Sequence, residues 1–247
     1  MANELTVVST MDLDTLMTGS GMLTALREEL GEDAQPSFAF AKMPSQGLTS
    51  WQIKVDEDDD DPEIVKSIEG VILLAQRNNA YWPDSIDNGG DRQPVCRSSD
   101  GLRGIDNEGC VHACAGCPQN KFGSDGKRGK ACKNSVKLYI LRDGLPLPMI
   151  LHISSTGINP YNKYVENLLL PKKRGQVPMR PVQVVTRIGL KTEQNADGIK
   201  YSKPTFEAIG KLDDTTRDAV RCIADQLAEA QQQDAMKMTA VDDTPFD

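Results

Sequence analysis

A polar, cysteine-rich segment restricts the fold of this chain more than any other feature. Five of the six cysteines lie between Cys96 and Cys132. The surrounding residues 84–135 are rich in Gly, Asp and Ser and contain no long apolar periodic stretch. A segment of this composition buries too little apolar surface to fold by itself. Its order must come from something other than a hydrophobic core, and the fold must carry it as an insertion.

The spacing of these thiols is that of a metal site. Cys114 and Cys117 form a C-x2-C pair, whose two thiolates can reach one ion. Cys96 lies 18 residues before the pair and Cys132 lies 15 residues after it. Tetrahedral zinc takes four such ligands and can fix a loop that is too polar to fold alone. We therefore predict a structural zinc site formed by these four cysteines.

Neighbouring residues keep other ligand sets open. A site that includes Cys110, or one of three cysteines with His112, is an alternative. The spacing Cys110-x3-Cys114-x2-Cys117 also resembles that of the iron–sulfur ligands in radical SAM enzymes. Those enzymes place the triplet after the first strand of an α/β barrel, whereas hairpin patterns follow it here. Clustered thiols in a chain without a visible secretory signal indicate metal rather than disulfides, so zinc is the first expectation.

The segments around the insertion have the pattern of β-strands joined by tight turns. Ile68–Pro83, which precedes the insertion, is β-branched and apolar at first and aromatic at its end, and it is the strongest strand candidate. Two hairpins are expected after the insertion, over residues 136–154 and 182–212. Each has an Asp-Gly dipeptide suited to a tight turn. These dipeptides are Asp143-Gly144 and Asp197-Gly198.

Two helices complete the predicted fold. A short one between the hairpins would be capped by Asn159 and begin at Pro160, and a second lies near the C-terminus. About five strands in hairpins, with a helix between the third and fourth, predict a mainly β (α+β) fold, an OB-type Greek-key barrel with a zinc-stabilised loop insertion. A mixed α+β sandwich is the alternative. The predicted parts are a leader with a short helix (1–35), an OB-like nucleic-acid-binding domain (36–212) with the zinc insertion at 84–135, a C-terminal helix (213–233) and a disordered acidic tail (234–247).

Charge is distributed unevenly along the chain. The formal net charge is −8, yet residues 76–212 carry 21 Lys and Arg against 12 Asp and Glu, whereas the flanks carry 7 against 24. A basic middle between acidic ends indicates an anion-binding body and acidic segments that can compete for it. The candidate phosphate contacts are Lys121, Lys127, Arg128, Lys130, Lys133, Lys137, Lys172, Lys173, Arg174 and Arg180. The candidate base-stacking residues are Tyr81, Trp82 and Phe122.

The last residues, AVDDTPFD, combine acids, a proline and one aromatic ring. Such a segment is a portable peptide ligand, because the ring can fill a pocket while the carboxylates meet a basic rim. Asp242, Asp243, Pro245 and Phe246 resemble the acidic ending of bacterial single-stranded DNA-binding proteins, with the difference that Asp247 follows the phenylalanine. The resemblance implies a tail that recruits replication and recombination proteins.

The predicted architecture has a second resemblance. A zinc-held insertion in an OB-type body is similar to the helix-destabilising proteins of T-even phages, whose zinc ligands are one histidine and three cysteines. Together the two resemblances imply a single-stranded DNA-binding protein of phage or mobile-element origin, which coats and protects unpaired DNA in replication and recombination. The alternative is a zinc-dependent interaction or transcription-associated module that binds protein or duplex DNA.

The remaining expectations concern activity and location. No catalytic triad, phosphate-binding loop or paired-carboxylate arrangement stands out, so no enzymatic activity is expected. The acidic N-terminus has no secretory signal and no stretch has the length of a membrane span, so we expect a cytoplasmic protein in a bacterial host without a membrane partner. A homo-oligomer is compatible with this interpretation.

Overall fold

The computed structural model describes residues 38–56, 58–83, 93–145, 147–170 and 176–240, with side chains to residue 232, and the single positions 5, 25, 28, 29 and 31 before them. Most of the predicted leader therefore lies outside the described residues. The same is true of several predicted contact residues. These are Lys172, Lys173 and Arg174 in the basic body, and Asp242, Asp243, Pro245 and Phe246 in the tail.

The chain divides into two compact units. We name Met1–Ala75 with Leu138–Ala228 the core unit, and Gln76–Lys137 with Glu229–Asp247 the cysteine unit. Two long strands carry the chain from one unit into the other. They are β4 (Ser67–Tyr81) and β8 (Cys132–Leu141). The predicted insertion at 84–135 therefore falls within the cysteine unit.

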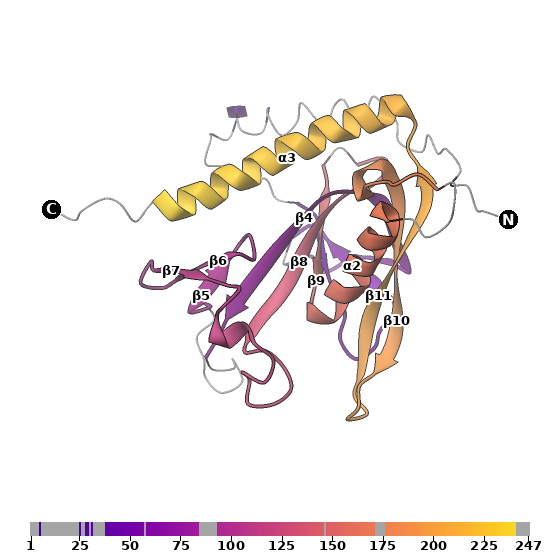
Figure 1. The fold of residues 1–247 in the computed structure, drawn as a ribbon. Coiled ribbons are helices and arrows are strands. Elements are labelled where there is room, and N and C mark those ends of the chain that lie inside the picture. The colour runs from indigo at the N-terminus through magenta and orange to yellow at the C-terminus, as the bar shows by residue number, and fades with distance from the viewer. Residues whose placement is uncertain are drawn as a thin grey trace. The chain divides into compact units, whose positions relative to one another are not determined.

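The described residues form a mainly β fold, with a large mixed sheet and two long helices (Figure 1). In the core unit the strand order is β3-β2-β1-β9-β8-β4, with β10 beside β4 and β11 beside β10. Strand β1 pairs in parallel with β9, and the other registered pairs of this unit are antiparallel. The bounds of the remaining strands are β1 Phe40–Lys42, β2 Trp51–Lys54, β3 Glu63–Val65, β9 Met149–Ile153, β10 Val184–Gln194 and β11 Lys200–Lys211.

Four of these strands form a Greek key. Strands β4, β8 and β9 come in this order along the chain, with the short strands of the cysteine unit between β4 and β8, and they lie side by side. Strand β10 then returns to pair with β4, so the spatial order is β10-β4-β8-β9. That order, in which the fourth strand lies beside the first, defines the motif. The connection from β9 to β10 contains helix α2 (Ser155–Leu169), as the sequence predicted for the helix between the hairpins.

The sheet is not closed into a barrel by strand pairing. Among the described strands, β3 and β11 are at opposite ends of the strand order in the core unit. Side chains near the two ends form hydrogen bonds with main-chain carbonyls instead. Trp51 Nε1 in β2 donates a 3.0 Å hydrogen bond to the carbonyl of Ile188 in β10, and Thr192 Oγ1 donates one of 2.6 Å to the carbonyl of Gly47. The sheet therefore curls, while the backbone ladder that would make it an OB barrel is not formed.

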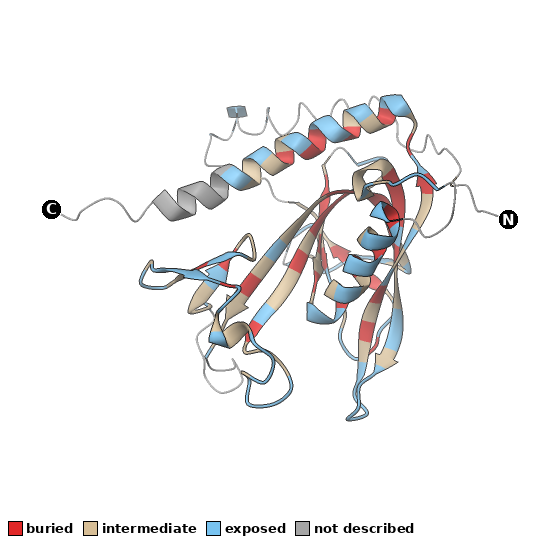
Figure 2. Ribbon diagram, viewed as in Figure 1, coloured by how far each residue is buried: buried red, intermediate tan, exposed pale blue. Residues whose placement is uncertain are grey.

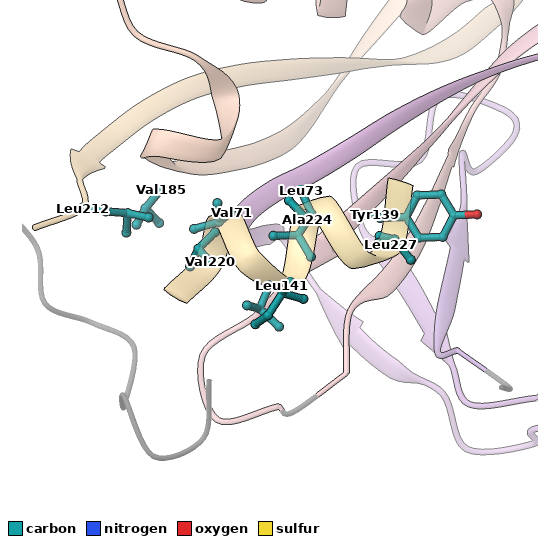
Figure 3. Close-up of a cluster of buried hydrophobic side chains, with 10 residues drawn as sticks. Val71, Leu73, Tyr139, Leu141, Val185, Leu212, Val220, Ala224 and Leu227 are labelled. Carbon is teal, nitrogen blue, oxygen red and sulfur yellow. The ribbon is translucent and has the colours of Figure 1, made fainter. Parts of the chain in front are cut away.

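Helix α3 (Asp214–Ala240) covers β4 and β8 in the core unit. Its buried residues Val220, Ile223, Ala224 and Leu227 recur at helical spacing and form one stripe (Figure 2). They pack against side chains that β4 and β8 direct toward them (Figure 3). These partners are Val71, Leu73, Tyr139 and Leu141. The helix continues to Ala240, beyond the expected end at residue 233.

Helix α2 begins earlier than predicted. Its N-cap is Ser154 and Pro160 lies inside it, so the expected cap at Asn159 is wrong. The early start places Gly157 against the sheet, where a Cβ atom would lie 2.4 Å from Ile153 Cγ2. Its buried face packs on β11, where the Tyr164 ring stacks on that of Phe206. No helix in the described part of the chain is long and apolar enough to cross a membrane.

Candidate metal centre and nucleic-acid surface

Short antiparallel strands bring the cysteines of the cysteine unit toward one another. Strand β5 (Cys96–Ser98) pairs with the end of β4, β6 (Arg103–Asp106) pairs with β5, and β7 (Val111–Ala113) pairs with β6. Cys96 begins β5, and Cys114 directly follows β7. Cys117 caps the 3-10 helix η2 (Pro118–Asn120), and Cys132 begins β8. Hydrogen bonds, rather than apolar packing, thus position the thiols.

The main chain of β6 fits closely against two of these sulfur atoms. A Cβ atom on Gly104 would lie 2.7 Å from Cys96 Sγ and 3.6 Å from Cys114 Sγ. Glycine is therefore the residue that lets both sulfurs approach this strand. Gly116, in the turn between Cys114 and Cys117, is less restricted. A Cβ atom there would meet nothing within 4 Å.

The four first-choice thiols lie within electrostatic reach of one another. Burial raises the pKa of Cys132 to about 11, and negative charge on Cys114, Cys117 and Cys96 adds to the rise. Burial also raises the pKa of Cys96, followed by the charges on Cys114 and Cys117. Cys114 and Cys132 are buried, and the other two are half-buried. The set combines four soft donors with mutual repulsion that a cation would relieve.

The four cysteines are ligands that suit zinc, although their positions are not those of a complete coordination sphere. Within the described ranges, no three His, Cys, Asp or Glu side chains form a ready metal-binding group. Four thiolates nevertheless make a complete tetrahedral set for zinc, and the space beside Gly104 accommodates two of the sulfurs. The residues therefore fit a structural zinc ion, which remains a prediction.

The two alternative ligands take part in the turn between β6 and β7. Asp106 Oδ1 accepts a 2.8 Å hydrogen bond from the main-chain N–H of Cys110, whose side chain is exposed. His112 Nε2 lies 2.6 Å from Asp106 Oδ2. This contact is the main cause that lowers the pKa of Asp106. Cys110 and His112 thus have a local role in the turn, which favours the four-cysteine set.

Residues 118–131, which we name the basic loop, fold around the side chain of Asp125. Asp125 Oδ1 accepts the main-chain N–H groups of Lys127 at 2.8 Å and of Gly129 at 3.0 Å. The N–H of Gly123 donates to the carbonyl of Gly129 at 2.7 Å. Gly123 has a φ of 88°, which glycine adopts readily. The one acid of the loop is thereby used as a turn acceptor, and Lys127 and Arg128 remain exposed at the tip.

An aromatic ring lies among these cations. Phe122 is 81% exposed, in line with its polar sequence neighbours. Lys130 Nζ lies 5.1 Å from the centroid of the Phe122 ring. Lys133, just after the loop, is exposed and donates from its Nζ to the Lys130 carbonyl at 3.0 Å. An exposed ring beside several cations is the combination that binds unpaired bases and their phosphates.

Most of the other predicted contact residues that the structure describes also lie in the cysteine unit. Lys121 is exposed and Lys137 is half-buried, as are Tyr81 and Trp82 at the end of β4. Arg180 belongs to the core unit, where it is exposed and its main-chain N–H donates to Gln183 Oε1 at 2.7 Å. Among the predicted contact residues that the structure describes, all except Arg180 therefore belong to the cysteine unit.

Sequence reasoning missed three asparagines that connect these parts. Asn120 Nδ2 donates to the carbonyl of Cys114 at 3.0 Å. Asn134 Nδ2 donates to Oδ1 of the buried Asn79 at 2.5 Å, and Asn79 Nδ2 donates to the carbonyl of Gly101 at 3.3 Å. The one available signal was the polar run Gln76–Asn79, which interrupts a strand pattern that begins apolar.

Comparisons with known proteins add no relative. No family model, curated protein or solved structure matches this chain. The resemblances to single-stranded DNA-binding proteins of bacteria and of T-even phages therefore stay predictions.

Proposed function

We propose that this chain is a single-stranded DNA-binding protein whose basic loop is held by a four-cysteine zinc site. The observation that carries the proposal is the pairing of the 81% exposed Phe122 ring with exposed cations on a loop next to four gathered thiols. A single exposed apolar side chain is common on protein surfaces, so the proposal rests on the position of the ring among cations and not on its exposure alone.

The chemistry of the loop favours unpaired nucleic acid over other anions. Lys127 and Arg128 offer two charges at the tip, and Lys121 and Lys133 offer two more near its ends. Such side chains neutralise phosphates and release counterions, which gives affinity without sequence preference. Stacking on Phe122 requires a base whose face is open, and this condition holds in a single strand but not inside a duplex.

The position of the insertion supports an OB-type body. In OB folds the loop between the first two strands is one of those that bind oligonucleotides. Here the insertion lies between β4 and β8, which are the first two strands of the Greek key. Strand β1 pairs in parallel with β9, and β3 and β11 are left at the two ends of the sheet. The body is therefore best described as an opened relative of that barrel.

Zinc would stabilise the folded loop and would take no part in a reaction. Cys96, Cys114, Cys117 and Cys132 would occupy all four positions, so no position is left for a reacting water, and an enzymatic role is not proposed. A structural zinc site can supply on the order of 10 kcal/mol to a module that is unfolded without metal. That amount is enough to hold a polar loop such as this one in a single conformation.

The biological role proposed is to coat and protect unpaired DNA during replication and recombination in a bacterial cell, as a protein of phage or mobile-element origin. The acidic tail with Asp242, Asp243, Pro245 and Phe246 would recruit partner proteins and compete with DNA for the basic loop. One observation favours the alternative of a zinc-dependent protein-binding module. Leu102 and Val111, in the β5–β7 region, are 69% and 57% exposed.

A direct binding experiment tests the proposal. Fluorescent oligo(dT) and a duplex of equal length are titrated with the zinc-loaded chain at two salt concentrations. We expect tighter binding to oligo(dT) and a steep loss of affinity at the higher salt. Equal affinity for the duplex with clear sequence dependence would instead support the alternative module.

A further inference from the structure

Lys130 differs from the other cations of the basic loop. It is half-buried, whereas Lys121, Lys127 and Arg128 are exposed. Its Nζ donates hydrogen bonds of 3.1 Å to Asn120 Oδ1 and 3.1 Å to Asn134 Oδ1. An ammonium group has three donors, so two of them are already used within the protein.

The two asparagines that hold Lys130 are themselves fixed. The Asn120 side chain donates to the carbonyl of Cys114, which belongs to the proposed metal centre. The Asn134 side chain donates to Asn79, which is 8% exposed. The position of the Lys130 ammonium is thus set from two directions, by the thiol cluster and by strand β4. Its charge also reaches Cys132, where it opposes the rise in the thiol pKa.

We propose that Lys130 is a positioning residue, which holds the Phe122 ring ready to stack on a base, and not a phosphate contact. The inference rests on the proposed function and deepens it. The ammonium lies 5.1 Å from the ring centroid, within the range of a cation–π interaction. A ring held in this way loses less conformational freedom when a base stacks on its other face. Lys127, which is exposed at the tip of the basic loop, serves as the phosphate contact for comparison.

The salt dependence of binding separates the two roles. Each phosphate contact to a single strand adds about 0.7 to the slope of log Kd against log salt. We expect Lys127→Met to lower the slope for oligo(dT) by about that amount. We expect Lys130→Met to weaken binding roughly two- to fivefold, the effect of an exposed cation–π contact, and to leave the slope unchanged. A slope that falls by about 0.7 in Lys130→Met would overturn the inference.

A double-mutant cycle with Phe122→Leu gives the second readout. If Lys130 acts through the ring, its substitution has almost no further effect once the ring is gone, whereas the effect of Lys127→Met persists. An equal loss from Lys130→Met in both backgrounds would contradict the proposal. The zinc content of each variant is measured in parallel, because a general loss of structure would release the metal.

Asn134→Ala provides a further variant should Lys130→Met lose zinc. It removes one acceptor of the ammonium and keeps every charge, so we expect weaker binding at an unchanged slope. Unchanged affinity in this variant would overturn the inference. The titration of the wild-type protein distinguishes a failure of the proposed function from a failure of the inference about Lys130. Absence of oligo(dT) binding by the wild-type protein would overturn the proposed function and the inference together, whereas wild-type binding with a phosphate-like Lys130 overturns the inference alone.

Discussion

The main chain of Gly104 lies directly against the sulfur of Cys96, because a Cβ atom on Gly104 would be 2.7 Å from Cys96 Sγ. Gly104 belongs to the middle strand of β5, β6 and β7, and Cys114 Sγ would be 3.6 Å from the same Cβ atom. A glycine in β6 thus lets two thiols from different parts of the chain share one space.

Gly104→Ala should weaken zinc binding by about tenfold, because the added methyl group has to displace a sulfur and overpacking costs about 1–3 kcal/mol. Competition with a chromophoric chelator measures the affinity. Gly116→Ala is the matched control, since its Cβ would meet nothing within 4 Å. Equal zinc affinity in both variants and the wild type would show that the space beside Gly104 does not limit zinc binding.

Cys132→Ser should abolish stoichiometric zinc, whereas Cys110→Ser should retain it. Cys132 is buried beside the other three thiols of the set, and Cys110 is exposed in the turn that Asp106 holds. Removal of one ligand from a closed site leaves it incomplete. Elemental analysis of both purified variants checks the expectation, and zinc loss from Cys110→Ser would indicate one of the alternative ligand sets. Iron in the wild-type protein would support the radical SAM alternative.

Zinc affinity should fall steeply as the pH is lowered. The pKa of Cys132 is about 11 and that of Cys96 is also raised, so both thiols hold their protons near neutral pH in the metal-free protein. Zinc binds the thiolates and must release these protons. These two groups alone should reduce the affinity about a hundredfold for each pH unit between pH 8 and pH 6, since each contributes about a factor of ten. Titration calorimetry in buffers of different ionisation enthalpy counts the released protons, and fewer than two near pH 7 would contradict the expectation.

The same raised pKa has the opposite consequence for the metal-free protein at high pH. The folded state holds the proton of Cys132 more tightly than the unfolded chain, whose thiol titrates at its ordinary pKa of 9.0. Below that pH both states carry the proton, so no penalty exists. As the pH rises from about 9 through about 11, the unfolded chain ionises first and the free energy of unfolding falls. Denaturant melts of metal-free wild type and Cys132→Ser across this range would show the difference.

Lys127→Gln with Arg128→Gln should reduce the salt dependence of oligo(dT) binding without loss of zinc. Both side chains are exposed at the tip of the basic loop, so each should account for about 0.7 of the slope on a single strand. Lys163→Gln with Lys211→Gln, two exposed substitutions in the core unit, is the control for total charge. An equal fall in slope for the control would mean that net charge, and not the loop, determines the affinity.

Features with local causes could be predicted from the sequence. The two Asp-Gly turns appear where expected, with Gly144 at φ 72° and Gly198 at φ 81°. The stripe of α3 is buried as its helical spacing indicates, because a single helix face decides it. The exposure of Phe122 also followed from its neighbours, which offer no apolar surface to cover it.

Features that depend on distant contacts could not be predicted. The parallel pairing of β1 with β9 joins segments far apart in the chain, and nothing in either strand specifies its partner. The hydrogen bond between Asn79 and Asn134 joins residues that are 55 positions apart, so the hydrogen-bonding site that holds Lys130 could not be predicted from the sequence. Helix α2 starts at Ser155 instead of Pro160. Gly157 in its first turn lies close to Pro204 and Met43, since a Cβ atom there would be 2.8 Å and 3.1 Å from their side chains, and such distant contacts outweigh the local cap signal.

The central claim is that a loop held by zinc binds unpaired DNA. Its most direct test is a fluorescence anisotropy titration of oligo(dT), performed with zinc-loaded and with zinc-stripped protein at low salt. Zinc-loaded protein should bind tightly, and removal of zinc should abolish most of the affinity, with recovery when the metal is restored. Equal binding by both forms, or no binding by zinc-loaded protein even when residues 241–247 are deleted, would contradict the account.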